Sequence, residues 1–189
     1  MRLFVAINLP DAVRNAIYAD AARLRAASPG VKWVAPSLLH LTLKFLGQQD
    51  DSLVGEFERG LASVASRHPR LEVQTRELGA FPNFRRPRVV WVGMTGTEAL
   101  AALAGDVDRM FATFGIAAES RPFRAHLTLG RVKHEMTAVE ARTLEAAARA
   151  ARRPRGFSVR TIDLMQSELG PGGSKYSVLA AVPLHARGT

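Results

Sequence analysis

The chain contains no cysteine among its 189 residues. This absence excludes disulfide bonds, a thiolate nucleophile and any metal site built on thiolate ligands. Long apolar runs are also missing, and the first residues, MRLFVAINLPD, interrupt their short apolar stretch with Asn8 and Pro10. Such a pattern predicts neither a transmembrane helix nor a signal peptide. We therefore expect a cytoplasmic protein that does not associate with membranes.

Acidic residues are outnumbered, because 17 Asp and Glu stand against 26 Lys and Arg, for a formal net charge of +9. Basic proteins attract polyanions, since Lys and Arg that neutralise phosphates release condensed counterions. Charge alone does not separate nucleic-acid-binding proteins from other Arg-rich proteins. The chain is long enough to form one compact domain, and its 47% hydrophobic residues can supply the buried core of that domain.

Histidine is scarce, with five in the chain, yet two of the five begin the same tetrapeptide. His40 opens HLTLKFLG, and His126 opens HLTLGRV 86 residues later (126 − 40). Side chains alternate between the two faces of a strand, so the His and Thr of each copy point to one face and the leucines to the other. If the leucines pack against helices, the two His/Thr faces are left to line one groove.

The segments around the two motifs follow the same order in both halves. The first half is expected to contain strands at 2–8, 31–34, 40–47 and 70–78, and helices from 11 to 27 and from 50 to 64. A segment rich in Pro, Asn and Gly follows at 79–88. It is expected to be a loop and is the best candidate for the connection between the two lobes.

The second half begins with a strand at 88–94 and a helix at 97–115 that is expected to be capped by Thr97 and ended by Gly115. The second motif strand then leads to a helix opened by a capping box from Thr137 to Glu140. Two final strands, 156–165 and 176–184, are expected to pair through the turn sequence GPGG. We expect a single domain over 1–189, with an internal repeat of roughly 1–80 and 87–165 and a C-terminal hairpin to 184.

Two facing histidines suit in-line substitution at phosphorus. Imidazole titrates near neutrality, so one ring can accept a proton from the nucleophile while the other gives one to the leaving group. The hydroxyls of Thr42 and Thr128, on the same faces, can donate hydrogen bonds to the phosphate oxygens between them. A metal site would need further ligands, and the chain has no His-Glu-x-x-His. Ser37 as nucleophile would lack the Gly-x-Ser-x-Gly elbow and would leave one His without a role.

These two His-x-Thr-x motifs resemble the signature of the 2H phosphoesterase superfamily. The segments RLFVAI, FPNFRRPRVVWVG, RPFRAHLTLGRV and SELGPGGSKYSVL are similar to those of the RNA 2′,3′-cyclic phosphodiesterase family, historically called 2′-5′ RNA ligase. The resemblance runs from Arg2 to about Leu184, nearly the whole chain. It implies an α+β fold of two pseudo-symmetric lobes, in which antiparallel sheets line a central groove and helices pack outside.

The resemblance also implies an enzyme without a cofactor or metal, which hydrolyses RNA 2′,3′-cyclic phosphate ends to 2′-phosphates, with 2′-5′ ligation as a side activity. His40 would be the proton donor to the departing 3′ oxygen, and His126 the proton acceptor that activates water. Thr42 and Thr128 would hold the phosphate. The implied partners are RNA with cyclic-phosphate ends or cyclic nucleotides, and we expect a monomer.

Phe45 and Arg131 lie close to the motifs and are candidates for contact with the terminal nucleotide. Strict alternation would place both on the face opposite the histidines, unless the strand ends or bulges first. A non-catalytic RNA- or nucleotide-binding module of the same fold is the alternative function. It would use the basic runs at 84–88 and 151–156, but it would not need duplicated His/Thr pairs.

Overall fold

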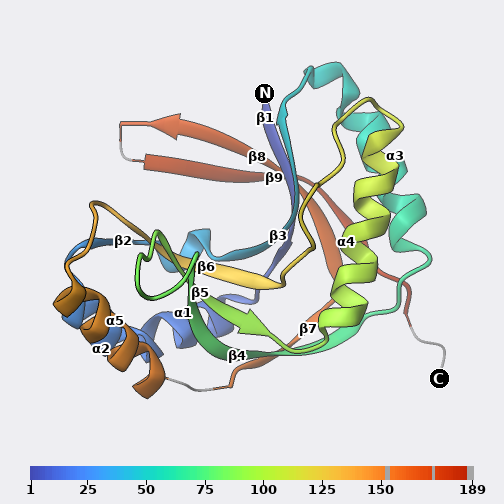
Figure 1. The fold of residues 1–189 in the computed structure, drawn as a ribbon. Coiled ribbons are helices and arrows are strands. Elements are labelled where there is room, and N and C mark those ends of the chain that lie inside the picture. The colour runs from blue at the N-terminus through green and yellow to red at the C-terminus, as the bar shows by residue number, and fades with distance from the viewer. Residues whose placement is uncertain (152–153, 172, 187–189) are drawn as a thin grey trace.

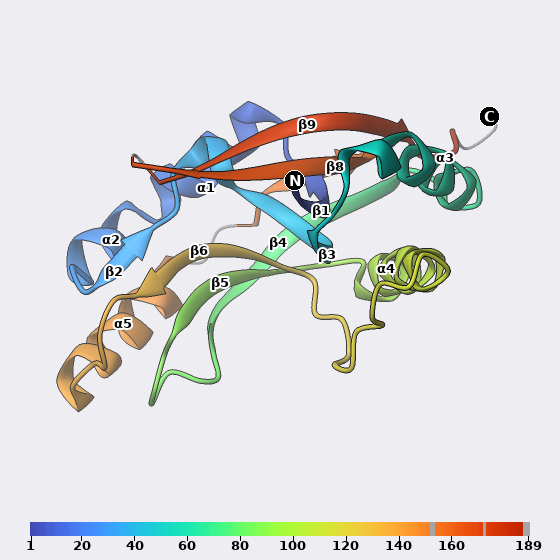
Figure 2. The ribbon, with the colours of Figure 1, turned by 90° about the horizontal axis from the view of Figure 1, so that it is seen from above.

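The computed structural model describes residues 1–151, 154–171 and 173–186 and has an α+β architecture. Its strands form one hydrogen-bonded antiparallel sheet in the order β7-β4-β5-β6-β3-β1-β8-β9, with β2 added beside β6. The strands are β1 (Arg2–Asn8), β2 (Val31–Trp33), β3 (His40–Gln48), β4 (Leu71–Phe81), β5 (Val89–Met94), β6 (His126–Val132), β7 (Gly156–Val159), β8 (Thr161–Gly170) and β9 (Gly173–Pro183). The sheet curls into two lobes, one around β1, β3, β8 and β9 and the other around β4, β5 and β6 (Figure 2).

The helices pack in two groups (Figure 1), with α3 beside α4 and α2 beside α5. Their bounds are α1 (Asp11–Asp20), α2 (Ala22–Ala27), α3 (Val54–Ala65), α4 (Thr97–Ala112) and α5 (Ala138–Ala150). None of the helices in the described ranges combines the length and hydrophobicity that crossing a bilayer requires.

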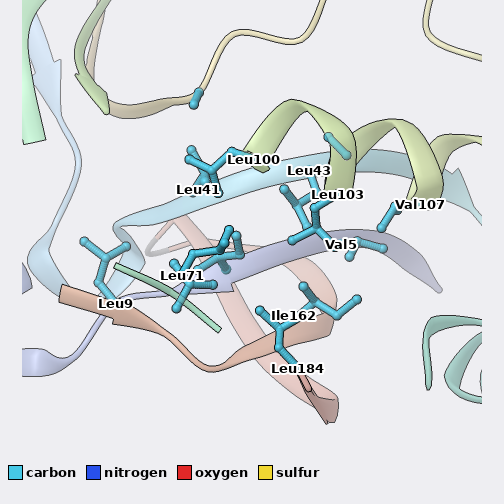
Figure 3. Close-up of a cluster of buried hydrophobic side chains, with 14 of the residues drawn as sticks. Val5, Leu9, Leu41, Leu43, Leu71, Leu100, Leu103, Val107, Ile162 and Leu184 are labelled. Atoms are coloured by element: carbon cyan, nitrogen blue, oxygen red, sulfur yellow. The ribbon is translucent and has the colours of Figure 1, made fainter. Parts of the chain in front are cut away.

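The leucines of the first motif strand belong to the main core. Leu41 and Leu43 of β3 are buried and lie beside Leu100 and Leu103 of α4 (Figure 3). The central strand β1 is buried on both faces, because it also contributes Phe4 to a second, smaller apolar cluster. Burial on both faces explains the continuous apolar run in RLFVAIN.

The capping box expected from Thr137 to Glu140 is confirmed at the start of α5. The Asp50 side chain accepts a hydrogen bond from the Ser52 backbone N–H, but it caps the short 3-10 turn Asp51–Leu53 that precedes α3. The expected cap at Thr97 is wrong, because Gly96 occupies the flanking position with φ of 67°. Glycine adopts this left-handed conformation readily, so the chain turns there and Thr97 becomes the first helical residue.

Other expected boundaries are corrected by pairing. The sequence predicts a loop from Gly79, but β4 continues as far as Phe81 because its last residues pair with β5. A Cβ at Gly79 would lie 2.2 Å from the Trp91 ring. Glycine is therefore needed at position 79 because the Trp91 ring occupies the space of a side chain, and not because the chain turns there. The strand expected at 156–165 divides at Arg160, since β7 pairs with β4 and β8 pairs with β1. The helix expected over 11–27 is interrupted at Ala21.

Candidate active site

The two motif strands are neighbours in the sheet and meet at one residue pair, Leu41 with Leu127. Because the strands are antiparallel, the residue before either leucine faces the residue after the other. Opposed side chains in such strands have Cβ atoms about 5 Å apart and share a face. That face lies opposite the buried leucines and carries half-buried His and Thr side chains. The resulting pairs are His40 with Thr128 and His126 with Thr42.

Both imidazoles make the same backbone hydrogen bond. Nδ1 of His40 lies 2.8 Å from the carbonyl oxygen of Leu38, and Nδ1 of His126 lies 2.7 Å from that of Arg124. A carbonyl oxygen can only accept, so Nδ1 carries the proton in each ring. This tautomer leaves Nε2 free to accept a proton or, once protonated, to donate one.

Burial lowers the pKa of both histidines below the ordinary value for the side chain. For His40, burial lowers the pKa most. The hydrogen bond to Leu38 raises the pKa in part, and the positive charge of Arg14 lowers it further. For His126, burial again leads, the hydrogen bond to Arg124 opposes it, and the charge of Arg131 lowers the pKa further. Both rings therefore favour the neutral form in the free protein.

Aromatic rings surround each imidazole. The His40 ring centroid lies 5.0 Å from that of Phe4 and 5.3 Å from that of Tyr176. The His126 ring meets Phe81 edge-on at 5.1 Å, and Phe81 in turn stacks on Trp91. These rings exclude water from one side of each imidazole and restrict its rotation.

A β-bulge in the first motif strand changes which residues face the groove. Val5 pairs with Lys44 and Ala6 with Thr42, so Leu43 is an extra residue without a partner in β1. Leu43 and Lys44 are both buried, and Phe45 is 60% exposed. This bulge is the stated exception to strict alternation, and it moves Phe45 to the other face of the strand.

The position of Phe45 follows from its neighbours. Phe4 lies between the two rings, with centroids 5.0 Å from His40 and 6.2 Å from Phe45. Phe45 thus lies on the same face as His40.

The second motif strand has a bulge at the equivalent position. Val90 pairs with Gly130 and Trp91 with Thr128, so Leu129 is the extra residue. Gly130 is required here, because a Cβ would lie 2.5 Å from a methyl group of Val31 on β2. The bulge returns the exposed Arg131 to the face of His126, in agreement with the effect of its charge on the pKa of that histidine.

Lys44, the residue after the bulge in β3, has a buried charge that the sequence did not reveal. Its Nζ donates to Oδ1 of Asp108 at 2.5 Å and to the carbonyl oxygen of Ala117 at 2.8 Å. Asp108 also accepts from the backbone N–H of Glu119. This pair of a buried lysine and a partly exposed aspartate ties the first motif strand to the segment that leads into the second.

No three His, Asp or Glu side chains in the described ranges lie close enough together to hold a metal ion. The hydroxyls of Thr42 and Thr128 make no hydrogen bond to another described protein group and so remain able to donate to a ligand. A hollow of about 280 Å³ lies beside His40, with Arg14, Asp163 and Tyr176 in its lining.

The sequence of this chain is similar to a family model and to several named proteins. A family model described as the 2′-5′ RNA ligase superfamily matches residues 9–171. An RNA 2′,3′-cyclic phosphodiesterase of Archaeoglobus fulgidus is 37% identical over 135 residues, which cover 71% of this chain and 74% of that protein. Its namesake in Methanothermobacter thermautotrophicus is 34% identical over 70% of this chain and 72% of that protein.

Solved structures agree over almost the full length. TT0787 of Thermus thermophilus superposes with a TM-score of 0.81 at 28% identity, covering 100% of both chains. E. coli LigT complexed with 3′-AMP gives a TM-score of 0.73 at 28% identity, covering 97% of both chains.

Proposed function

The chain belongs to the 2′-5′ RNA ligase superfamily, and from that premise we propose that it hydrolyses RNA 2′,3′-cyclic phosphate ends to 2′-phosphates without a metal. Relatives bearing the name RNA 2′,3′-cyclic phosphodiesterase support the substrate class. The observation that carries the proposal is the pairing of Leu41 with Leu127, since it brings two His/Thr pairs to one face of the sheet.

His126 acts as the base. Its Nε2 accepts a proton from water while the water oxygen forms a bond to phosphorus. Burial keeps the ring neutral and therefore able to accept this proton.

His40 acts as the acid. The bond between phosphorus and the 3′ oxygen breaks, and Nε2–H of the His40 imidazolium protonates the departing oxygen, leaving the phosphate on the 2′ oxygen. The negative charge of the bound phosphate favours the imidazolium, so substrate binding raises the pKa of His40 from its low value in the free protein.

Thr42 and Thr128 donate hydrogen bonds to the non-bridging oxygens, where negative charge grows in the transition state. Each hydroxyl lies beside the imidazole of the other motif, so both can reach one phosphate held between the rings. Phe45 and Arg131 share this face because of the two bulges. We assign Phe45 to stacking on the terminal base and Arg131 to contact with the terminal nucleotide.

Ligation through a 2′-5′ bond follows from the same arrangement. A 5′-hydroxyl group takes the place of water, and His126 removes its proton while that oxygen forms a bond to phosphorus. The bond between phosphorus and the 3′ oxygen breaks, His40 protonates the departing 3′ oxygen, and the phosphorus is left bridging the 2′ and 5′ oxygens. Abundant water favours hydrolysis, which makes joining the side reaction.

The proposal is tested with a panel of 2′,3′-cyclic nucleotides and short RNAs ending in a cyclic phosphate. Hydrolysis should yield the 2′-phosphate, distinguished from the 3′-phosphate by ³¹P NMR or by chromatography against standards. Binding of these ligands without any product would favour a non-catalytic binding module instead. Formation of the 3′-phosphate would contradict the assignment of the leaving oxygen.

A further inference from the structure

The hollow beside His40 contains two polar groups that the proposed hydrolysis does not use. Arg14 and Asp163 both contribute to its lining, together with Ser37 and Tyr176. Two other cavities among the described residues measure about 20 and 10 Å³, which is room for about one water each. At about 280 Å³, the hollow approaches the lower limit of small-molecule pockets.

Arg14 is fixed in place before any ligand binds. Its Nε donates to the carbonyl oxygen of Leu9 at 2.7 Å, and one terminal nitrogen donates to that of Ser37 at 2.9 Å. The side chain is only 18% exposed, and its charge lowers the pKa of His40. The second terminal nitrogen makes no hydrogen bond within the described ranges, so it is available to an anion.

Asp163 offers the opposite chemistry. The residue is 4% exposed, and its Oδ2 accepts a hydrogen bond from Asn8 Nδ2 at 2.7 Å. Its Oδ1 is buried and has no partner in the described part of the chain. A buried acceptor left unpaired is costly, so it favours a ligand that brings a hydroxyl or amine donor.

One ligand class satisfies both groups. A free phosphate would suit Arg14 but would be repelled by Asp163, whereas a ribonucleotide unit carries a phosphate and a hydroxyl donor together. The preceding nucleotide is joined through the 5′ carbon on C4′, the ring carbon bonded to C3′. The RNA chain therefore leaves the terminal ribose on the side of the 3′ oxygen, which faces His40 in the proposed reaction.

We infer that this hollow binds the nucleotide preceding the cyclic end, with Arg14 on the internucleotide phosphate and Asp163 on the ribose 2′-hydroxyl. The inference rests on the proposed function. It makes the protein prefer RNA ends over cyclic mononucleotides and requires no particular base at the preceding position.

The test compares kcat/KM for uridine 2′,3′-cyclic phosphate with that for the dinucleotide ApU ending in the same cyclic phosphate. Wild-type protein should prefer the dinucleotide. Arg14→Gln should lose about tenfold to a hundredfold on the dinucleotide, as expected for a hydrogen bond to a charged group, and little on the mononucleotide. Each variant is measured at its own pH optimum, because removal of Arg14 also raises the pKa of His40.

Arg142→Gln is the matched control, since Arg142 is an exposed arginine on α5 and its loss removes the same charge. Equal losses of Arg14→Gln on both substrates would assign Arg14 a structural role and overturn the inference. A wild-type protein without preference for the dinucleotide would do the same. Failure of wild-type protein to hydrolyse either substrate would overturn the proposed function and this inference together.

The Asp163 contact has its own test. Replacing the first ribose of the dinucleotide with 2′-deoxyribose should lower kcat/KM for wild-type protein. Asp163→Asn still accepts the hydrogen bond from Asn8 but presents an amide donor in place of the free oxygen, so it should no longer discriminate between the two sugars. Equal rates of wild-type protein on both dinucleotides would remove Asp163 from the inference.

Discussion

His40 and His126 each donate Nδ1–H to the carbonyl oxygen of the residue two positions earlier, at 2.8 and 2.7 Å. The two rings therefore expose the same nitrogen to the groove. Their different proposed roles arise from the substrate, since water lies beside one ring and the departing oxygen beside the other.

Loss of either histidine should slow the chemical step strongly. His40→Ala or His126→Ala should each lower kcat by roughly 10²–10⁴, the usual contribution of a general acid or base. The double variant should lose less than the product of the single losses, because both groups act in one transition state. Steady-state kinetics measure this, with His134→Ala as the control.

An activated aryl phosphodiester separates acid from base. Its good leaving group needs little protonation, so it should restore turnover in His40→Ala and not in His126→Ala. Rescue of His126→Ala instead would reverse the assignment, and full activity of either variant on the cyclic phosphate would end the two-histidine mechanism.

Chelation should leave the reaction unchanged. The proposed chemistry uses only side chains, so hydrolysis should persist at full rate in EDTA. Loss of activity on chelation, with recovery on addition of zinc or manganese, would contradict the mechanism.

The pH dependence should reflect the low pKa of both rings. kcat/KM should be bell-shaped, with each limb displaced to more acidic pH than for an ordinary histidine, because burial favours the neutral ring. Removing the nearby charge with Arg131→Gln should raise the pKa of His126 and move the acidic limb to higher pH. Arg14→Gln should instead move the basic limb upward. Unchanged limbs in both variants would contradict the electrostatic account.

The pair of buried Lys44 and partly exposed Asp108 should matter to stability. Asp108→Ala leaves the Lys44 ammonium buried without its carboxylate. Because Asp108 is 21% exposed, the loss should be smaller than the roughly 3–5 kcal/mol of a fully buried pair. Denaturant unfolding measures this, with Glu98→Ala on the same helix as the control. The double variant Lys44→Met/Asp108→Leu should recover part of the loss, whereas a loss equal to the sum of the single variants would argue against a direct pair.

Local patterns predicted the motif strands and the start of α5 because the residues that form them are neighbours in the chain. The capping box at Thr137 needs contacts over only three positions. The bulges could not be predicted in this way, since an extra residue is recognised only against its partner strand, as Leu43 is against β1. The contact of Asn8 with Asp163 spans 155 positions and depends on the order of strands in the sheet.

The internal repeat of roughly 1–80 and 87–165 stays a prediction, and the bulges at Leu43 and Leu129 lie at equivalent positions of its two halves. The monomeric state and the cytoplasmic location also stay predictions. Light scattering coupled to gel filtration should give the mass of one chain.

The pairing of Leu41 with Leu127 also has a mechanical consequence. The two lobes of the sheet join where β3 pairs with β6, so any change in the angle between the lobes would be a rotation about this junction, called here the seam. The displacement of an atom in such a rotation grows with its distance from the rotation axis. The His and Thr side chains next to the seam would shift least, while the far end of the β8–β9 hairpin would sweep the widest arc. The spacing of the His and Thr side chains is therefore the feature of the site that a change in the angle between the lobes would alter least.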